Sequence, residues 1–213
     1  VRSAAAALAP AVRMLLGGAG QRFVVFSEWN GLQATRLQAE CARLGAACLL
    51  APPAVSADHL LDWCGTQLPG SGCRVLGVDG LGFFVHSDDK ADADALLQAI
   101  RTGTDPKRLR RRYPDRARFP GRIAIVTGSA QGFGEGIARE LAAQGMTLVI
   151  ADLNATLAEA NAASLEEEHG PGAAIALGVD VGREDSVRRM VEDTVLAFGG
   201  LDVLVSNAGV LRA

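Results

Sequence analysis

The sequence has no run of apolar residues long enough to cross a membrane as a helix. Nearly half of its 213 residues are apolar (49%), but a helical span needs about 20 of them in succession. The opening stretch of small apolar residues is divided by Arg13, and no cleavage pattern follows, so we interpret it as an amphipathic helix rather than a signal peptide. We therefore predict no membrane partner. Because the sequence does not begin with Met, we expect a processed or partial chain.

Patterns typical of metal sites are also missing. The four cysteines, Cys41, Cys48, Cys64 and Cys73, form no Cys-x-x-Cys pair, and the three histidines lie far apart in the sequence. Zinc ligands usually come in closely spaced pairs. We predict no metal site, and we interpret the cysteines as reduced core residues of a cytoplasmic protein.

Aromatic residues are scarce where a nucleic-acid surface would need them. The stretch from Lys107 to Arg118 carries seven basic residues and one Asp, but its only aromatic residue is Tyr113. Proteins that bind single strands interleave several aromatic residues for base stacking. Pro114 and Pro120 break helices. We therefore predict a solvated basic linker at 107–120, between domains at 1–106 and 121–213, and no nucleic-acid partner.

What the second domain does contain is a regular alternation of buried strands and helices. The pattern predicts strands at 122–128, 147–152, 174–181 and 201–209, and helices at 134–145, at 154–169 with Asn154 as cap, and along a face of Val187, Val191, Thr194, Val195 and Phe198. Apolar runs without polar alternation are typical of strands that are buried on both faces. The sequence therefore predicts an α/β fold with a Rossmann-type, doubly wound parallel sheet that ends after its fourth strand.

The first hundred residues show a looser version of this alternation. Strands are predicted at 22–26, 47–51, 73–78 and 82–86, and helices along Leu37, Cys41 and Leu44, at 58–64, and from Asp88 or Asp89 to Ile100. No glycine cluster of the kind that binds phosphates occurs there. We predict a smaller α/β domain preceding the Rossmann-type sheet.

A glycine cluster follows the first strand of the second domain. Gly128 is predicted to turn the chain, while Gly132 and Gly134 leave room for backbone N–H groups to approach a pyrophosphate at a helix N-terminus. Glycines also occur in tight turns that bind nothing. Asp152 favours the dinucleotide, because it ends the second strand where a carboxylate accepts hydrogen bonds from ribose hydroxyls. The alternative for Asp152 is a cap at the end of the strand.

Four motifs in this order resemble the short-chain dehydrogenase/reductase family. They are "TGSAQGFG" at 127–134, "AD" at 151–152, "DV" at 180–181 and "NAG" at 207–209, and the resemblance covers essentially all of 121–213. It implies that Asp180 contacts the adenine with Val181 packed beside it, and that Asn207, Ala208 and Gly209 hold the central sheet near the cofactor.

The resemblance gives a set of cofactor-binding candidates. They are Gly128, Ser129, Gln131, Gly132, Phe133, Gly134, Asp152, Leu153, Asp180, Val181, Asn207, Ala208 and Gly209. The family usually has Asn-Asn-Ala-Gly in its last motif, and Ser206 replaces the first Asn here. We expect this departure to alter a local hydrogen bond rather than the fold.

The predicted cofactor is NAD rather than NADP. The carboxylate of Asp152 would face a 2'-phosphate at close range, and relatives that use NADP place a basic residue in the glycine turn or after the second strand. Gln131 and Leu153 occupy these places here.

The catalytic residues that the resemblance implies are missing from the sequence. The family uses a Ser and a Tyr-x-x-x-Lys beyond its Asn-Ala-Gly motif, but this sequence ends at Ala213, its one tyrosine is Tyr113, and no lysine follows Lys107. We therefore predict no catalytic residue and no activity in the chain alone. In a longer parent protein we expect hydride transfer with an alcohol or carbonyl substrate, with sugars and polyols as candidates.

Two other interpretations stay open: a dinucleotide-binding sensor or interaction module without catalysis, and a structural remnant that binds nothing. The unpaired sheet edge predicts a homo-oligomer.

The first domain has a fainter resemblance of its own. The stretches "LGAACLLAPPAVSADHLL" and "CRVLGVDGLGFFVHSDDKADADALLQAI" are similar to the later part of a class II aldolase-like domain that precedes a short-chain dehydrogenase on one chain. The junction is shortened and the His-x-His metal motif of such aldolases is missing. The resemblance therefore indicates domain architecture only.

Overall fold

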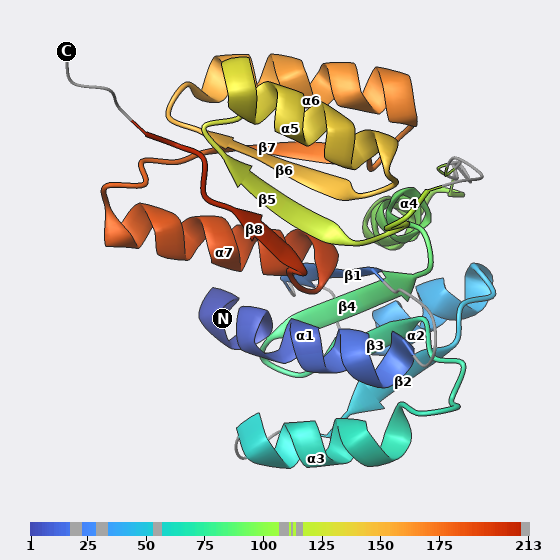
Figure 1. Ribbon diagram of the computed structural model, residues 1–213. Coiled ribbons are helices and arrows are strands. Elements are labelled where there is room, and N and C mark those ends of the chain that lie inside the picture. Colours follow the sequence, from blue (N-terminus) through green and yellow to red (C-terminus); the bar gives the residue numbers. More distant parts are fainter. Residues whose placement is uncertain are drawn as a thin grey trace. The chain divides into compact units, whose positions relative to one another are not determined.

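The computed structural model describes residues 1–17, 23–28, 34–52, 57–106, 111, 113 and 117–209 (Figure 1). The chain divides into two compact units, Val1–Leu109 with Val195–Gly200, and Arg110–Thr194 with Leu201–Ala213. The grouping of 195–200 with the first unit was not predicted. The domain boundaries 1–106 and 121–213 stay a prediction. In the described ranges, no helix combines the length and apolar character that crossing a membrane requires.

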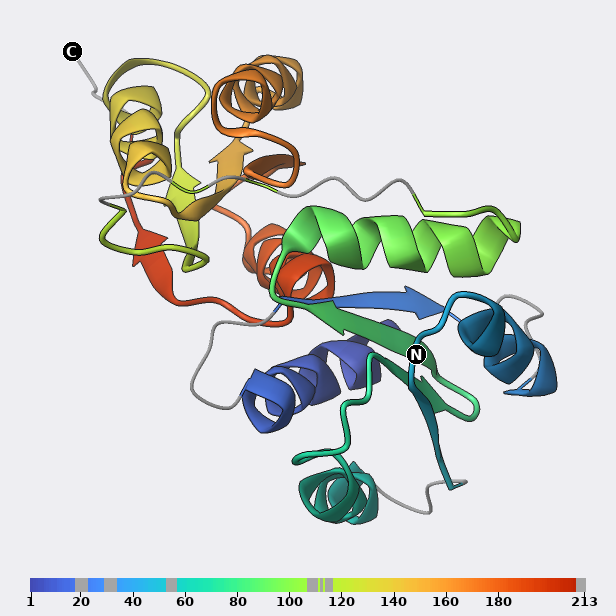
Figure 2. The same ribbon diagram turned by 90° about the vertical axis from the view of Figure 1, so that its right-hand side faces the viewer.

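The first unit is a four-stranded mixed sheet with helices on both faces. Its elements are α1 (Arg2–Gly17), β1 (Phe23–Glu28), α2 (Ala34–Arg43), β2 (Cys48–Ala51), α3 (Ala57–Gln67), β3 (Val75–Val78), β4 (Gly82–Ser87) and α4 (Lys90–Thr102). The strand order is β1-β4-β3-β2. One core cluster joins the sheet to α1 and α3, and another joins it to α2 and α4. Figure 2 shows α1 and α4 on opposite sides of β4.

This sheet differs from the parallel sheet of the second unit because β3 and β4 form a hairpin. Only β2 and β3 are parallel, whereas β4 runs antiparallel to both β3 and β1. Asp79 and Gly80 lie in the turn, with Gly80 at a φ of 72°. An Asp-Gly dipeptide between two apolar runs favours a hairpin.

The four cysteines all lie in this unit as free thiols. Cys41, Cys64 and Cys73 are buried and Cys48 is half-buried. Burial raises the pKa of both Cys64 and Cys73 to about 11. These two thiols therefore stay protonated at neutral pH, as expected of packing residues.

The second unit is a parallel sheet of the predicted Rossmann type. Its elements are β5 (Ile123–Thr127), α5 (Gly132–Ala143), β6 (Thr147–Asp152), α6 (Ala155–His169), β7 (Ala174–Gly178), α7 (Glu184–Phe198) and β8 (Val203–Val205). The strand order is β7-β6-β5-β8, and every pair is parallel. Helices α5 and α6 cover one face, and the part of α7 in this unit lies on the other (Figure 1). The predicted fold class is confirmed.

The order of the strands creates a switch point beside β5. The chain steps outward from β5 to β6 and β7, then returns through α7 to place β8 on the other side of β5. Ligands of open α/β sheets bind in the crevice that opens there, at the carboxyl ends of the strands.

Local signals predicted the helices closely, with one error in α7. Helix α6 begins after Asn154, whose side chain accepts a hydrogen bond from the Leu157 N–H at 3.1 Å, as expected of the cap. On α7, Val191 was predicted to face the core but is 37% exposed, whereas Met190 is 3% exposed. Thr194, Val195 and Phe198 are buried as predicted, so the spacing identified the buried face except at Val191.

One basic residue of the predicted linker, Arg111, is not solvated, whereas Arg118 is exposed. Residues 107–110, 112 and 114–116 lie outside the described residues. Arg111, however, is buried, and its guanidinium donates to Thr147 Oγ1 at 3.1 Å and to the Met146 carbonyl at 2.9 Å. Arg111 thus belongs to the packing of the second unit.

Replacing Arg111 with Met should destabilise the protein. The exchange keeps an apolar stem but removes both donors from the buried Thr147 hydroxyl and Met146 carbonyl, at a cost of about 1.5 to 3 kcal/mol. Urea unfolding followed by circular dichroism measures it. Arg118→Met is the control, since Arg118 is exposed and a surface exchange changes stability by less than about 0.5 kcal/mol. Equal losses in the two variants would contradict a bracing role for Arg111.

Candidate functional site

A pocket of about 670 Å³ lies at the carboxyl ends of β5, β6 and β7 in the second unit. It gathers all of the predicted site residues except Ser129, and it adds Ala151, Val179 and Gly182. The lining residues are Gly128, Gln131, Gly132, Phe133, Gly134, Ala151, Asp152, Leu153, Val179, Asp180, Val181, Gly182, Asn207, Ala208 and Gly209. Segments more than 70 residues apart in the sequence thus meet at the switch point.

The three glycines of the cluster are required for different reasons. A Cβ on Gly134 would overlap the Gly128 carbonyl oxygen, and a Cβ on Gly128 would lie 2.8 Å from Ala208 Cα. These two positions are therefore explained by packing within the protein. Gly132 differs, because a Cβ there would meet no protein atom within 4 Å, although its φ of 65° also favours glycine. Gly132 lines the pocket.

The amino end of helix α5 lies at the pocket, which Gly132, Phe133 and Gly134 line. Gln131 precedes the first helical residue, and its side chain makes no capping hydrogen bond. The first N–H groups of a helix have no intrahelical partner and carry a partial positive charge. The arrangement can therefore accept an anionic group beside Gly132.

Ser129 was predicted as a cofactor-binding residue, but its side chain is buried beneath the turn. The hydroxyl donates to the Val126 carbonyl at 2.6 Å and accepts from the Ala151 N–H at 3.2 Å. It thereby ties the end of β5 to the end of β6. The Ser129 side chain thus shapes the turn and is not among the residues that line the pocket, and a contact between this residue and a cofactor stays a prediction.

Two backbone N–H groups donate hydrogen bonds to the carboxylate of Asp152. One carboxylate oxygen accepts from the Ala130 N–H in the glycine turn at 3.0 Å, and the other accepts from the Asn154 N–H at 2.9 Å. The hydrogen bonds agree with the interpretation as a cap, while the side chain also lines the pocket, so a contact to a ribose stays a prediction. A carboxylate has about four acceptor positions, so capacity remains for further donors.

Two exposed apolar side chains flank the carboxylates. Leu153 follows β6 and is 76% exposed, and Val181 follows β7 and is also exposed. The carboxylate of Asp180, which also follows β7, accepts from the Gly182 N–H at 2.9 Å. The backbone N–H of Asp180 donates to Ser186 Oγ at 3.0 Å. The pocket thus combines apolar walls with two carboxylates, and no Lys or Arg is among the lining residues that the structure describes.

The segment after β8 is fixed by Thr127, which the site prediction did not include. Its hydroxyl oxygen accepts from the N–H groups of Asn207 and Ala208, each at 3.1 Å. The Asn207 amide in turn donates to the carbonyl oxygens of Thr127 at 2.9 Å and Gly128 at 3.1 Å. Thr127 is the first residue of the glycine motif, so its position was visible in the sequence although its role was not.

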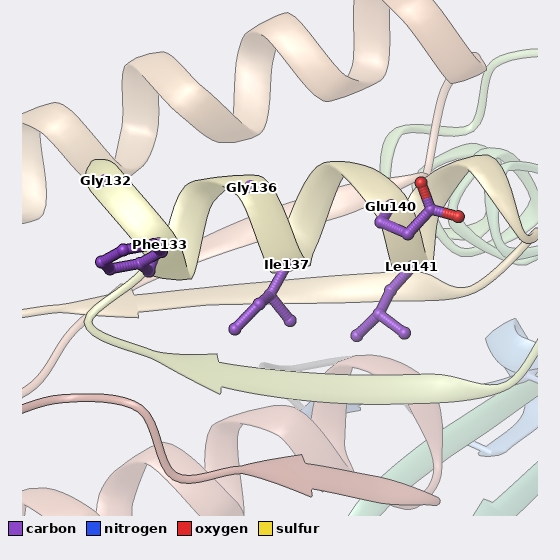
Figure 3. Close-up of a pocket in the computed structure, with 6 residues that line it drawn as sticks. All are labelled: Gly132, Phe133, Gly136, Ile137, Glu140 and Leu141. Carbon is purple, nitrogen blue, oxygen red and sulfur yellow. The ribbon is translucent and has the colours of Figure 1, made fainter.

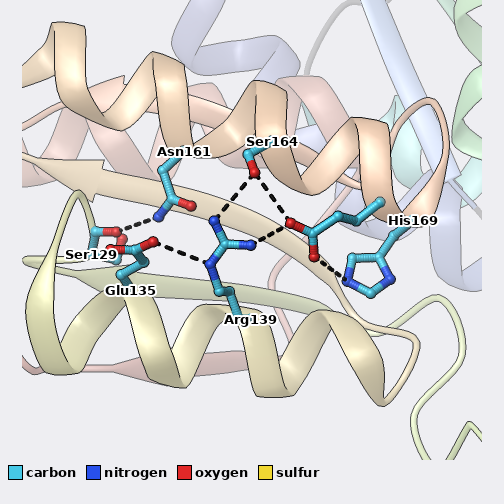
Figure 4. A network of polar contacts seen from close by, with 7 residues as sticks. Ser129, Glu135, Arg139, Asn161, Ser164 and His169 are labelled. Carbon is cyan, nitrogen blue, oxygen red and sulfur yellow. Dashed lines mark hydrogen bonds and ion pairs between the residues drawn. The ribbon is translucent and has the colours of Figure 1, made fainter.

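A polar network joins α5 to α6 behind the glycine turn (Figure 4). Arg139 on α5 donates to Glu135 at 3.1 Å, to Glu168 at 2.5 Å and to Ser164 at 3.2 Å. The hydrogen bond from Arg139 holds the pKa of Glu168 below its usual range, and burial lowers the pKa of His169. The network therefore favours a charged Glu168 beside a neutral His169.

A second hollow of about 430 Å³ lies along α5. It is lined by Gly132, Phe133, Gly136, Ile137, Glu140 and Leu141. Figure 3 shows Phe133, Ile137 and Leu141 on one side of the helix. Ile137 and Leu141 are half-buried and pack against the core of the second unit, and Phe133 is 90% exposed.

In the ranges that the structure covers, no group of three or more His, Cys, Asp or Glu side chains could hold a metal ion. The arrangement at the switch point is instead that of an anion-accepting helix end, two carboxylates and apolar walls.

Comparison with known proteins matches the second unit to one family. The model of the family described as "short chain dehydrogenase" covers residues 122–213. It does not extend into residues 1–106, so the aldolase-like resemblance of that part stays a prediction.

Three relatives illustrate the match. An uncharacterized oxidoreductase, YuxG, of Bacillus subtilis is 38% identical over 96 residues, 45% of this chain and 14% of that protein. L-fucose dehydrogenase of Oryctolagus cuniculus is 42% identical over 93 residues, 44% of this chain and 31% of its own length. L-rhamnose 1-dehydrogenase (NAD(P)(+)) of Azotobacter vinelandii is 44% identical over 91 residues, 42% of this chain and 36% of its own length.

The matched part spans between 14% and 36% of the length of these relatives. Within that part, the parallel β5-to-β8 order, the glycine turn and the Asn207–Ala208 contact to Thr127 occur together. Residues 122–213 therefore match the short-chain dehydrogenase family in sequence, and the geometry of this segment agrees with that match.

Proposed function

We propose that residues 122–213 bind NAD and form the cofactor-binding part of a dehydrogenase or reductase. The full protein would transfer hydride between NAD(H) and the alcohol or carbonyl group of a small molecule. The observation that carries the proposal is the open space beside Gly132, where the uncapped end of α5 faces into the switch-point pocket.

The pyrophosphate would lie at this helix end. Backbone N–H groups at the start of α5 supply donors and a partial positive charge, and Gly132 leaves them uncovered by a side chain. Gly128 and Gly134 serve the packing that brings the helix end there. The residues present therefore fit the diphosphate group of a dinucleotide.

The adenosine half would lie across the ends of β6 and β7. The remaining acceptor positions of Asp152 suit the two hydroxyls of a ribose, and Leu153 and Val181 provide apolar surfaces on either side for a purine ring. Asp180 stands where the family resemblance implies a contact to the adenine.

The charges of the pocket favour NAD over NADP. Asp152 and Asp180 are both acidic, and among the described residues that line the pocket there is no basic side chain to balance the additional phosphate of NADP. A phosphate next to Asp152 would place like charges close together at low dielectric, which is unfavourable. The name of the relative from Azotobacter vinelandii includes both cofactors, so relatives alone leave the choice open.

The bound nicotinamide would supply the hydride chemistry, whereas the general acid and base must come from elsewhere. The sequence has one tyrosine, Tyr113, and no lysine after Lys107. Relatives named as L-fucose and L-rhamnose dehydrogenases support a sugar or polyol as substrate. A homo-oligomer in the cytoplasm is also proposed. The alternative is a dinucleotide sensor without catalysis, which would bind NAD equally well.

Gly132→Ala should weaken NAD binding at least about tenfold, because a methyl group would stand where the pyrophosphate approaches the helix end. The left-handed backbone adds a strain of about 1 to 2 kcal/mol. Gly170→Ala is the matched control, since Gly170 has a φ of 92° and lies outside the pocket. Calorimetric titration with NAD compares the two folded variants. Equal affinities would show that the space beside Gly132 is not a phosphate site.

Asp152→Asn should weaken NAD binding by about 1.5 to 3 kcal/mol, since the amide cannot accept as strongly from ribose hydroxyls. It should also narrow the preference over NADP, because it removes the charge that repels the additional phosphate. Glu159→Gln, which removes an exposed carboxylate from α6, controls for net charge. Titrations with both cofactors measure the change. An unaltered protein that binds NADP as tightly as NAD would refute the assignment.

The chain of 213 residues should show no dehydrogenase turnover, because it lacks the tyrosine and lysine pair that the family resemblance implies. The test follows NADH absorbance with a panel of sugars, polyols and simple carbonyls. Activity that persists through further purification and through Tyr113→Phe would mean that another catalytic group is present. Tyr113 itself lies 5.0 Å from the Arg111 guanidinium and outside the pocket lining.

A further inference from the structure

One peptide group in the glycine turn is held at both ends by side chains. The Ala130 N–H donates to Asp152 at 3.0 Å, and the Ser129 carbonyl accepts from Asn161 Nδ2 at 2.7 Å. Figure 4 shows the second of these bonds, from α6 to the turn. Because a peptide group is planar, two bonds at opposite ends fix its orientation. The backbone that continues into Gln131 and Gly132 therefore starts from a fixed plane.

Asn161 is buried, and only one end of its amide is satisfied. The side chain is 6% exposed, and its Oδ1 atom has no hydrogen-bond partner in the described part of the chain. The orientation of the amide is set by the Ser129 carbonyl, which can only accept. A buried acceptor without a partner lowers stability, so such a residue calls for a reason other than stability.

We propose that Asn161 is a positioning residue for the pyrophosphate of the dinucleotide. By holding the Ser129 carbonyl, it sets the direction in which the N–H groups at the start of α5 point into the pocket. Asn161 is not among the pocket's lining residues, so it acts through the turn rather than on the ligand. The inference rests on the proposed function and adds a residue that no motif contains.

Ser164 offers a matched comparison on the same helix. It lies three residues further along α6, where its hydroxyl accepts from Arg139 and donates to Glu168, each at 3.2 Å. Both side chains bond residues that follow β5 in the chain. The partner of Asn161 is Ser129 in the turn, whereas Arg139, a partner of Ser164, lies within α5 (Figure 4). Removing the Ser164 hydroxyl therefore tests contacts between α5 and α6 without disturbing the peptide group at Ser129.

The experiment compares Asn161→Asp, Asn161→Ala and Ser164→Ala with the unaltered chain. Asn161→Asp keeps the shape and replaces the donor with an oxygen, and Asn161→Ala removes the whole amide without adding charge. Affinity is measured for NAD and, by ligand-observed NMR, for adenosine, which has no phosphates. Amide hydrogen exchange of residues 128–132 is measured without ligand.

If Asn161 positions the turn, both Asn161 variants should lower the affinity for NAD about threefold to tenfold, which is the effect of one hydrogen bond. Adenosine affinity should stay within about twofold, because Asp152, Leu153 and Val181 remain in place. Exchange at Ala130 should become faster in the ligand-free variants. Ser164→Ala should change none of these quantities.

Three results would overturn the inference while leaving the proposed function intact. The first is an unchanged NAD affinity, and the second is an equal loss of affinity for NAD and for adenosine. The third is an unchanged rate of amide hydrogen exchange in the turn. Failure of both Asn161 variants to fold would also overturn it, because the residue would then support the fold as a whole. An unaltered chain that binds neither NAD nor adenosine would overturn the proposed function itself, and the inference with it.

Discussion

The start of helix α5 lies so close to the end of strand β5 that no side chain fits between them. A Cβ on Gly134 would overlap the Gly128 carbonyl oxygen and would lie 2.6 Å from Asn207 Nδ2. This close approach lets the Asn207 amide reach the carbonyl groups of Thr127 and Gly128, which connects the turn to the segment after β8. The position of the helix end in the pocket, and the pairing of the loops that surround it, both depend on this contact.

The walls of the pocket are therefore coupled through the backbone rather than placed independently. Asp152 at the end of β6 bonds the turn after β5 and also the entry to α6. The buried Ser129 hydroxyl bonds the ends of β5 and β6, and the Thr127 hydroxyl accepts from the Asn207 N–H in the segment after β8. Hydrogen bonds of this kind hold donors in place before a ligand arrives, which reduces the ordering that binding requires.

The sequence predicted the second unit well because its signals are local. Buried strands such as β5 and β6 appear as uninterrupted apolar runs, and Asn154 marks the start of α6 by its capping side chain. The pocket could be predicted almost completely, since the motifs follow the strands whose carboxyl ends meet at one edge. Each of these inferences needs only neighbouring residues and the parallel order of the strands.

The errors concern properties that spacing does not determine. A motif identifies which residues are near a turn, but not whether a side chain such as that of Ser129 points into the pocket or beneath it. Helical spacing on α7 could not decide between Val191 and Met190, because both are apolar and adjacent. Arg111 was taken as solvated because charge runs usually are, while its partners Thr147 and Met146 lie about 35 residues away. Asn161 belongs to no motif, so only the structure connects it to the turn.

The pocket also shows how binding and chemistry would be divided along the chain. Groups suited to a ribose, a purine and a diphosphate all come from the ends of β5, β6 and β7. The Asn207–Gly209 segment after β8 is the one other part of the described chain that lines the pocket, and it offers no titratable side chain. On the proposed function, recognition of the adenosine diphosphate half is therefore complete within this unit. The reactive half depends on groups beyond it, so the affinity for the dinucleotide can be separated from turnover.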